Sequence, residues 1–141
     1  GFVKQVNELV SPSPEDCRGS LHPAAREGVR LFNLGQYWKA HEALEKAWLE
    51  ETGQVRHLYR GILQVSVAYF HITRGDYPGA VKVFKRSLRW LTPFPAICRG
   101  IAVEQLRQDA ANAFQEVRRL GPERITQFDK GFLKPVFLMG A

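Results

Sequence analysis

No apolar run in the sequence approaches the length of roughly 18 residues that a helix needs to cross a bilayer. We therefore predict no transmembrane helix. Its first ten residues, GFVKQVNELV, do not resemble a signal peptide, because Lys4, Asn7 and Glu8 interrupt them. There is also no glycine-rich phosphate loop, no GxSxG motif and no cysteine nucleophile with an obvious partner. We therefore expect a protein without membrane association, and we find no motif of a common enzyme class.

Cysteine is scarce. Cys17 and Cys98 are the two cysteines, and neither belongs to a CxxC motif or to a Cys/His pattern with metal-ligand spacing. Cysteines so far apart in a cytosolic protein are more often free, buried thiols than a disulfide. The sequence thus predicts two free thiols.

The length and composition of the chain are typical of one globular domain. It has 141 residues, of which 45% are hydrophobic and 24% are charged. The net charge of +6 is unevenly distributed. Residues 1–70 carry 8 basic and 8 acidic residues, whereas residues 71–141 carry 12 basic and 6 acidic ones. A basic half of this kind indicates an anionic partner, although it does not specify a fold.

Apolar residues recur with helical spacing in five segments, predicted at about 23–34, 36–52, 55–74, 76–91 and 96–120. Glycines and a Gly-Pro pair mark the ends of most of these helices. The third segment is apolar over most of its circumference, which predicts a central helix. Because no segment alternates between apolar and polar residues, we predict no sheet. The predicted fold is all-α, a single bundle of about five helices built on two antiparallel helical hairpins.

We divide the chain into an N-terminal turn and Pro/Ser linker (1–22), a helical domain (23–120) and a hydrophobic tail (121–141). The tail is expected to dock as an extended strap, on the helices or on a neighbouring subunit. Residues 33–48 and 73–88 are similar to each other, in the manner of tetratricopeptide repeats. Two copies favour a closed bundle over an open solenoid.

One set of polar residues is predicted to meet inside the bundle. His41 and Glu45 are four residues apart and share one face of the second helix. Gln64 and His71 belong to a stripe of small and polar residues on the third helix. If these two faces meet, the side chains form a polar cluster, which together with Glu42 comprises His41, Glu42, Glu45, Gln64 and His71.

Three interpretations of the cluster remain open. It forms a structural hydrogen-bond network, or His41, Glu45 and His71 bind a divalent transition metal such as zinc or iron. In the third interpretation, it is a small-molecule or hydrolytic pocket with Glu42 or Glu45 as the base and a histidine as the acid. The segment HEALE is not the HExxH protease motif. The sequence leaves open whether the protein is an enzyme, and it identifies no substrate or small-molecule ligand.

The predicted fourth helix carries a basic face, to which Arg118 and Arg119 add charge. This face is either solvated or binds phosphate or nucleic acid, although no nucleic-acid-binding motif accompanies it. The residues of the basic face are Lys82, Lys85, Arg86 and Arg89.

Exposed aromatic residues and the hydrophobic tail also favour self-association, with a homodimer as the expected form.

Two long motifs occur in order within residues 29–95. The first fits F-N-x-G-x-[YF]-x-x-x-H-E-x-x-E-x-x-W, and the second combines a G-x-x-Q helix with H-x-x-x-G-[ND]-x-x-G-A. By these motifs the segment resembles the domain-of-unknown-function 309 family. Asp76 stands where asparagine is common, and both residues cap helices. The resemblance implies an all-α fold and a cytoplasmic or plastid-stromal protein, but no activity. The matching residues are Phe32, Asn33, Gly35, Tyr37, His41, Glu42, Glu45 and Trp48, then Gly61, Gln64, Ala68, His71, Gly75, Asp76, Gly79 and Ala80.

Overall fold

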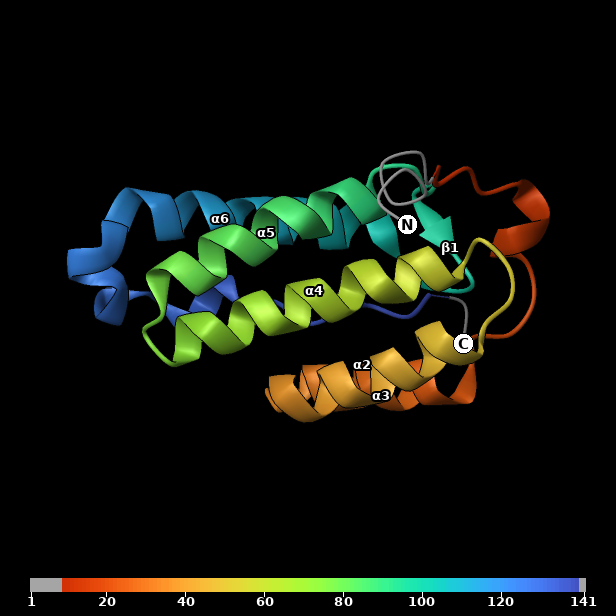
Figure 1. The fold of residues 1–141 in the computed structure, drawn as a ribbon, viewed down its shortest axis with the longest axis horizontal. Coiled ribbons are helices and arrows are strands. Elements are labelled where there is room, and N and C mark those ends of the chain that lie inside the picture. Colours follow the sequence, from red (N-terminus) through yellow and green to blue (C-terminus); the bar gives the residue numbers. More distant parts are fainter. Residues whose placement is uncertain (1–8, 140–141) are drawn as a thin grey trace, which may run out of the picture.

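The structure, a computed structural model, describes residues 9–139 and confirms an all-α bundle (Figure 1). The turn predicted at the N-terminus lies almost entirely outside the described residues. The five α-helices of the described residues are α2 (Pro23–Asn33), α3 (Tyr37–Glu50), α4 (Arg56–Thr73), α5 (Tyr77–Leu91) and α6 (Val103–Arg124).

Local sequence chemistry explains where these helices begin and end. Gly35 and Gly75 follow α2 and α4 with φ of 78° and 70°, a left-handed conformation that glycine adopts without a steric penalty. Asp76 precedes α5, and its Oδ1 accepts a hydrogen bond from the Gly79 backbone N–H at 3.0 Å. The two hairpins α2–α3 and α4–α5 therefore have similar turns, as the internal repeat predicts.

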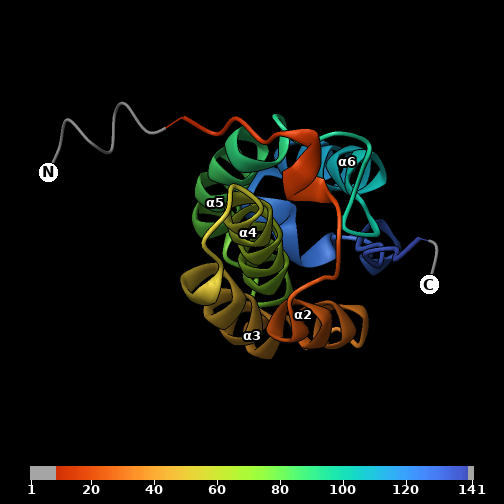
Figure 2. The ribbon, with the colours of Figure 1, turned by 90° about the vertical axis from the view of Figure 1, so that its right-hand side faces the viewer.

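Helix α4 is the central helix of the bundle, with α3 and α5 packed against it (Figure 2). Tyr59, Ile62 and Tyr69 on α4 are fully buried. Burial of each such side chain stabilises the fold by about 1.5–3 kcal/mol. Gly61 permits the close contact with α5, because a Cβ at this position would lie 2.7 Å from Leu91 Cδ2.

Two of the predictions for residues 92–102 are wrong. The last long helix begins at Val103 rather than near residue 96, and a short antiparallel hairpin precedes it, formed by β1 (Ile97–Cys98) and β2 (Ile101–Ala102). The hairpin turn has positive φ at Arg99 (48°) and Gly100 (83°), which a helix cannot accommodate. The stop predicted at Gly121 is confirmed, because its φ of 71° and ψ of 177° are not helical and separate residues 122–124 from the long part of α6.

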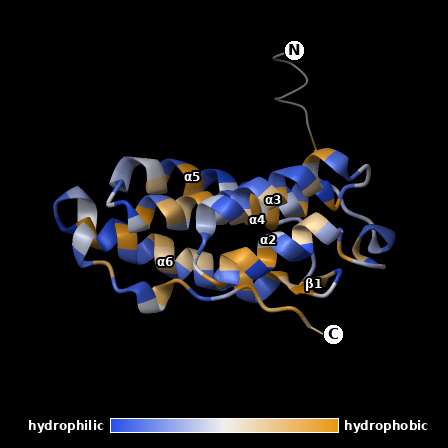
Figure 3. Ribbon diagram, turned by 90° about the horizontal axis from the view of Figure 1, so that it is seen from below, coloured by the Kyte–Doolittle hydropathy of each residue, from blue (hydrophilic) through white to orange (hydrophobic). Residues whose placement is uncertain are grey.

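The segments at both ends contain further short elements. The predicted linker includes a 3-10 helix, η1 (Pro14–Cys17). The tail contains η2 (Ile125–Gln127) and η3 (Lys130–Phe132), and its last described residues run along the helices as the predicted strap (Figure 3). Asn33 fixes this strap: its Nδ2 donates to the Val136 carbonyl oxygen at 2.9 Å, and its Oδ1 accepts from the Val136 N–H at 2.8 Å.

Candidate functional site

The predicted polar cluster is divided between different partners. The His41 ring packs against Trp38 at 4.5 Å between ring centroids, with the two planes tilted by 37°. Its Nδ1 lies 3.2 Å from the Trp38 carbonyl oxygen, within hydrogen-bond distance. Trp38 in turn contacts Phe70 of α4 at 5.0 Å. His41 is therefore half-buried beside an indole ring, in a position that packing alone accounts for.

The second histidine of the cluster belongs to the α4–α5 turn. His71 Nδ1 lies 3.0 Å from Asp76 Oδ2, and the same aspartate caps α5. A Cβ at Gly79 would approach His71 Nδ1 to 2.8 Å, so the glycine at this position leaves room for this pair. His71 thus stabilises the beginning of α5.

The remaining members are less connected. Glu42 and Glu45 are exposed, and within residues 9–139 neither forms a hydrogen bond or an ion pair. Gln64 is half-buried, and its Oε1 is buried without a hydrogen-bond partner among the described residues. No group of three or more His, Cys, Asp or Glu side chains in the described part of the chain is arranged to hold a metal ion, so the predicted ligands His41, Glu45 and His71 do not form such a group.

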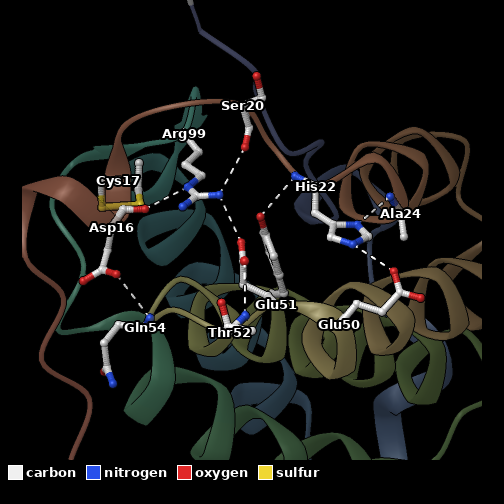
Figure 4. Close-up of polar contacts among 12 residues, drawn as sticks. Asp16, Cys17, Ser20, His22, Ala24, Glu50, Glu51, Thr52, Gln54 and Arg99 are labelled. Carbon is white, nitrogen blue, oxygen red and sulfur yellow. Dashed lines mark hydrogen bonds and ion pairs between the residues drawn. A yellow bond between two sulfur atoms is a disulfide. The ribbon is translucent and has the colours of Figure 1, made fainter.

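A different polar network lies at the other end of α3, around Arg99 (Figure 4). The Arg99 guanidinium donates to the carbonyl oxygens of Asp16 (2.8 Å) and Ser20 (3.2 Å) and to Glu51 Oε1 (3.0 Å). Its backbone N–H donates to the Cys17 carbonyl oxygen at 2.9 Å. Arg99 therefore joins the N-terminal segment, the α3–α4 turn and the β1–β2 hairpin, which explains a non-glycine residue at positive φ.

Two neighbouring groups extend this network. Asp16 accepts hydrogen bonds from Ser13 and from the Gln54 N–H, and the bond from the Ser13 backbone is the largest cause that lowers the pKa of its carboxyl group. His22 Nε2 lies 3.0 Å from Glu50 Oε1, and the His22 N–H donates to the Tyr59 hydroxyl at 3.1 Å. Burial raises the pKa of Tyr59. The network thus anchors the segment before α2 on α3 and α4.

A disulfide joins Cys17 and Cys98, so the prediction of free thiols is wrong. The two residues are 81 positions apart, but packing of η1 against β1 brings their Cα atoms to 4.4 Å. Disulfides are typical of oxidising compartments. A cytoplasmic or plastid-stromal location stays a prediction.

The basic face of α5 is present as predicted, since Lys82, Lys85, Arg86 and Arg89 are all exposed. Arg118 lies on α6 with its guanidinium 5.3 Å from the Phe114 ring. Arg119 differs from it, because its Nε donates to Glu116 Oε1 at 2.6 Å. The available cations beside α5 therefore include Arg118 but not Arg119.

Sequence reasoning missed two polar features. Arg99 follows a cysteine in a Cys-Arg-Gly-Ile segment, which is a weak hairpin signal because Asn-Gly or Asp-Gly is usual there. Asp109 is a buried carboxylate on α6. It could have been found, because it occupies the helical stripe that contains Leu106, Ala110 and Ala113.

The fold and these contacts define a class: a helical-bundle domain with covalently and ionically fixed flanking segments. Residues 25–83 match the family model described as "Domain of unknown function (DUF309)", which confirms the family resemblance. An uncharacterized protein of Aquifex aeolicus (strain VF5) is 28% identical over 83 residues, which cover 58% of this chain and 25% of the relative. The chain thus spans about a quarter of that relative's length. Within residues 9–139, every helix is too short or too polar to cross a membrane.

Proposed function

We propose that this protein has a binding rather than a catalytic role, and that the basic face of α5 binds the phosphate backbone of nucleic acid. The observation that carries the proposal is the charge of α5. Its sequence, YPGAVKVFKRSLRWL, contains four exposed cations and no acidic residue. Lys82, Lys85, Arg86 and Arg89 form no ion pair within residues 9–139, so their charge is available to an anionic partner.

Two exposed arginines on other helices, Arg30 and Arg119, are neutralised locally. Arg30 pairs with Glu27 on α2, with Nε donating to Oε2 at 2.8 Å. Arg119 pairs with Glu116 on α6 in the same i, i+3 arrangement. Such pairs contribute little to stability, but they cancel charge along a helix face. Helix α5 has no such ion pairs between arginine and glutamate within residues 9–139. It lies in the half of the chain that carries the whole net charge.

The geometry of the face fits a chain of phosphates. Residues 82 and 89 are two helical turns apart, about 10 Å along the axis at a rise of 1.5 Å per residue. A groove of about 220 Å³ between α5 and α6 is lined by Leu88, Phe114 and Arg118 among others, which extends the cationic surface. Contacts of this kind recognise phosphate without base specificity.

The alternatives have less support. A hydrolase would use His41, Glu45 and His71 together, but the two histidines have separate partners in Trp38 and Asp76. A homodimer stays a prediction. Its expected surface is the group of exposed apolar side chains at the hairpin and the strap, namely Ile97, Phe137, Leu138 and Met139.

The test is the salt dependence of binding to a fluorescent 20-base-pair DNA duplex, followed by anisotropy. Four phosphate contacts predict a slope of about −3.6 for log K against log salt concentration. The K82Q/K85Q variant should reduce the steepness of this slope by about 1.8. The matched control is K39Q/K46Q, which removes the same charge from exposed positions of α3. Equal effects of the two variants, or binding that does not respond to salt, would contradict the proposal.

A further inference from the structure

A carboxylate is buried in the apolar face of α6. Asp109 is 8% exposed and lies among the buried side chains of Leu106, Ala110 and Ala113. A carboxylate in such surroundings loses hydration, and this loss must be offset by hydrogen bonds or by a counter-charge. The contacts of its two oxygens therefore show whether hydrogen bonds from the protein offset this loss.

One of these oxygens lacks a partner. Asp109 Oδ1 accepts a hydrogen bond from Gln105 Nε2 at 2.9 Å, whereas Oδ2 is buried and accepts none from the described residues. The Asp109 carboxylate also acts on Tyr69 of α4. Burial is the largest cause that raises the pKa of the Tyr69 hydroxyl, and the charge of Asp109 is the next. An ionised Asp109 would thus be stabilised by a donor that carries positive charge.

Asp109 also lines a pocket of about 370 Å³ between α6 and the C-terminal strap. This volume falls within the range of small-molecule sites. Phe132 supplies an apolar wall, while Asp129 and Lys134 are exposed side chains on the strap. The other lining residues are Asn112 and Gly131.

We propose that this pocket binds a small aliphatic amine, with an ammonium group of the ligand donating to the Asp109 carboxylate. An ammonium has several donors and a full positive charge, which match a carboxylate that accepts one hydrogen bond, from Gln105, among the described residues. The alkyl chain of the ligand packs against Phe132. Asp129 provides a second carboxylate for a second ammonium, so the preferred ligand class is the diamines. This site is separate from the basic face of α5 and takes a ligand of opposite charge.

The probe is 1,4-diaminobutane, titrated into the ¹⁵N-labelled protein and followed by amide chemical shifts. Saturable shifts are expected at residues 109, 112 and 129–134. The D109N variant should weaken binding about 10-fold or more, since it removes a charge-assisted hydrogen bond. Butane-1,4-diol, which has the same length and no charge, should leave these amides unchanged. D109N is expected to fold, because asparagine has the same shape and removes a buried charge.

The control variant is E104Q, which changes the net charge equally at an exposed position of the same helix. It should bind the diamine with unchanged affinity. Equal affinities of D109N and the unaltered protein, or shifts that do not saturate by about 10 mM diamine, would overturn the proposal.

Lys134 provides a second, independent test. With an amine as the partner of Asp109, K134M should keep its melting temperature and bind the diamine more tightly, because a competing cation is lost. A lower melting temperature combined with unchanged diamine affinity would overturn the proposal, since Lys134 itself would then be the partner of Asp109.

Discussion

Reduction of the Cys17–Cys98 disulfide should lower the free energy of unfolding by about 4.5 kcal/mol at 25 °C. The bond joins residues 81 positions apart. In the chain-entropy relation, a loop of this length restricts the unfolded chain by about 15 cal/mol/K, and multiplication by the temperature gives the stated value. Domains of this size are usually stable by only about 5–15 kcal/mol. The reduced protein should therefore be marginally stable.

The assay is urea denaturation of the protein with and without dithiothreitol, and of the C17A/C98A variant under both conditions. The reduced protein should unfold at a clearly lower urea concentration than the oxidised protein. The variant should resemble the reduced protein and should not respond to dithiothreitol, which separates loss of the bond from other effects of the reductant. A difference below about 1 kcal/mol in the free energy of unfolding between oxidised and reduced protein would show that the disulfide does not restrict the unfolded chain as calculated.

Three further predictions concern the helical core and the strap. N33A removes both hydrogen bonds to Val136, so the strap should become more sensitive to proteolysis, with a loss of about 1–3 kcal/mol in unfolding measurements. G61A places a Cβ 2.7 Å from Leu91 Cδ2 and should lower stability by about 1–3 kcal/mol; an unchanged melting temperature would contradict the tight packing of α4 on α5. The pKa of Tyr69 is raised in the folded state, so its unfolded form loses the proton first and stability should fall as the pH rises above about 10. Y69F should make this alkaline loss shallower in unfolding experiments across that pH range.

The helices could be predicted because their signals are local. Gly35, Gly75 and Asp76 determine the ends of neighbouring helices by their own backbone and capping chemistry. The β1–β2 hairpin could not be predicted in this way, because arginine is a poor residue for a turn with positive φ. Arg99 adopts this conformation owing to contacts with Asp16 and Glu51, which are distant in the sequence.

The candidate site was harder to predict than the fold. Spacing correctly placed His41 on a half-buried face of α3, but it could not show that Trp38 would cover the imidazole. His71 was expected to face α3. Its Nδ1 instead lies 3.0 Å from Oδ2 of Asp76, which is five residues further along the chain. The partners of a polar side chain depend on rotamers and on local turns, and helical periodicity does not encode these.

The proposed function requires that the basic face of α5 contacts a phosphate backbone. The most direct measurement is the footprint of a DNA duplex on the ¹⁵N-labelled protein. We expect the amide shifts to concentrate at residues 82–89 and near Arg118, and to fade as salt is added. Shifts centred on α3, or no shifts at low salt, would contradict the proposed function.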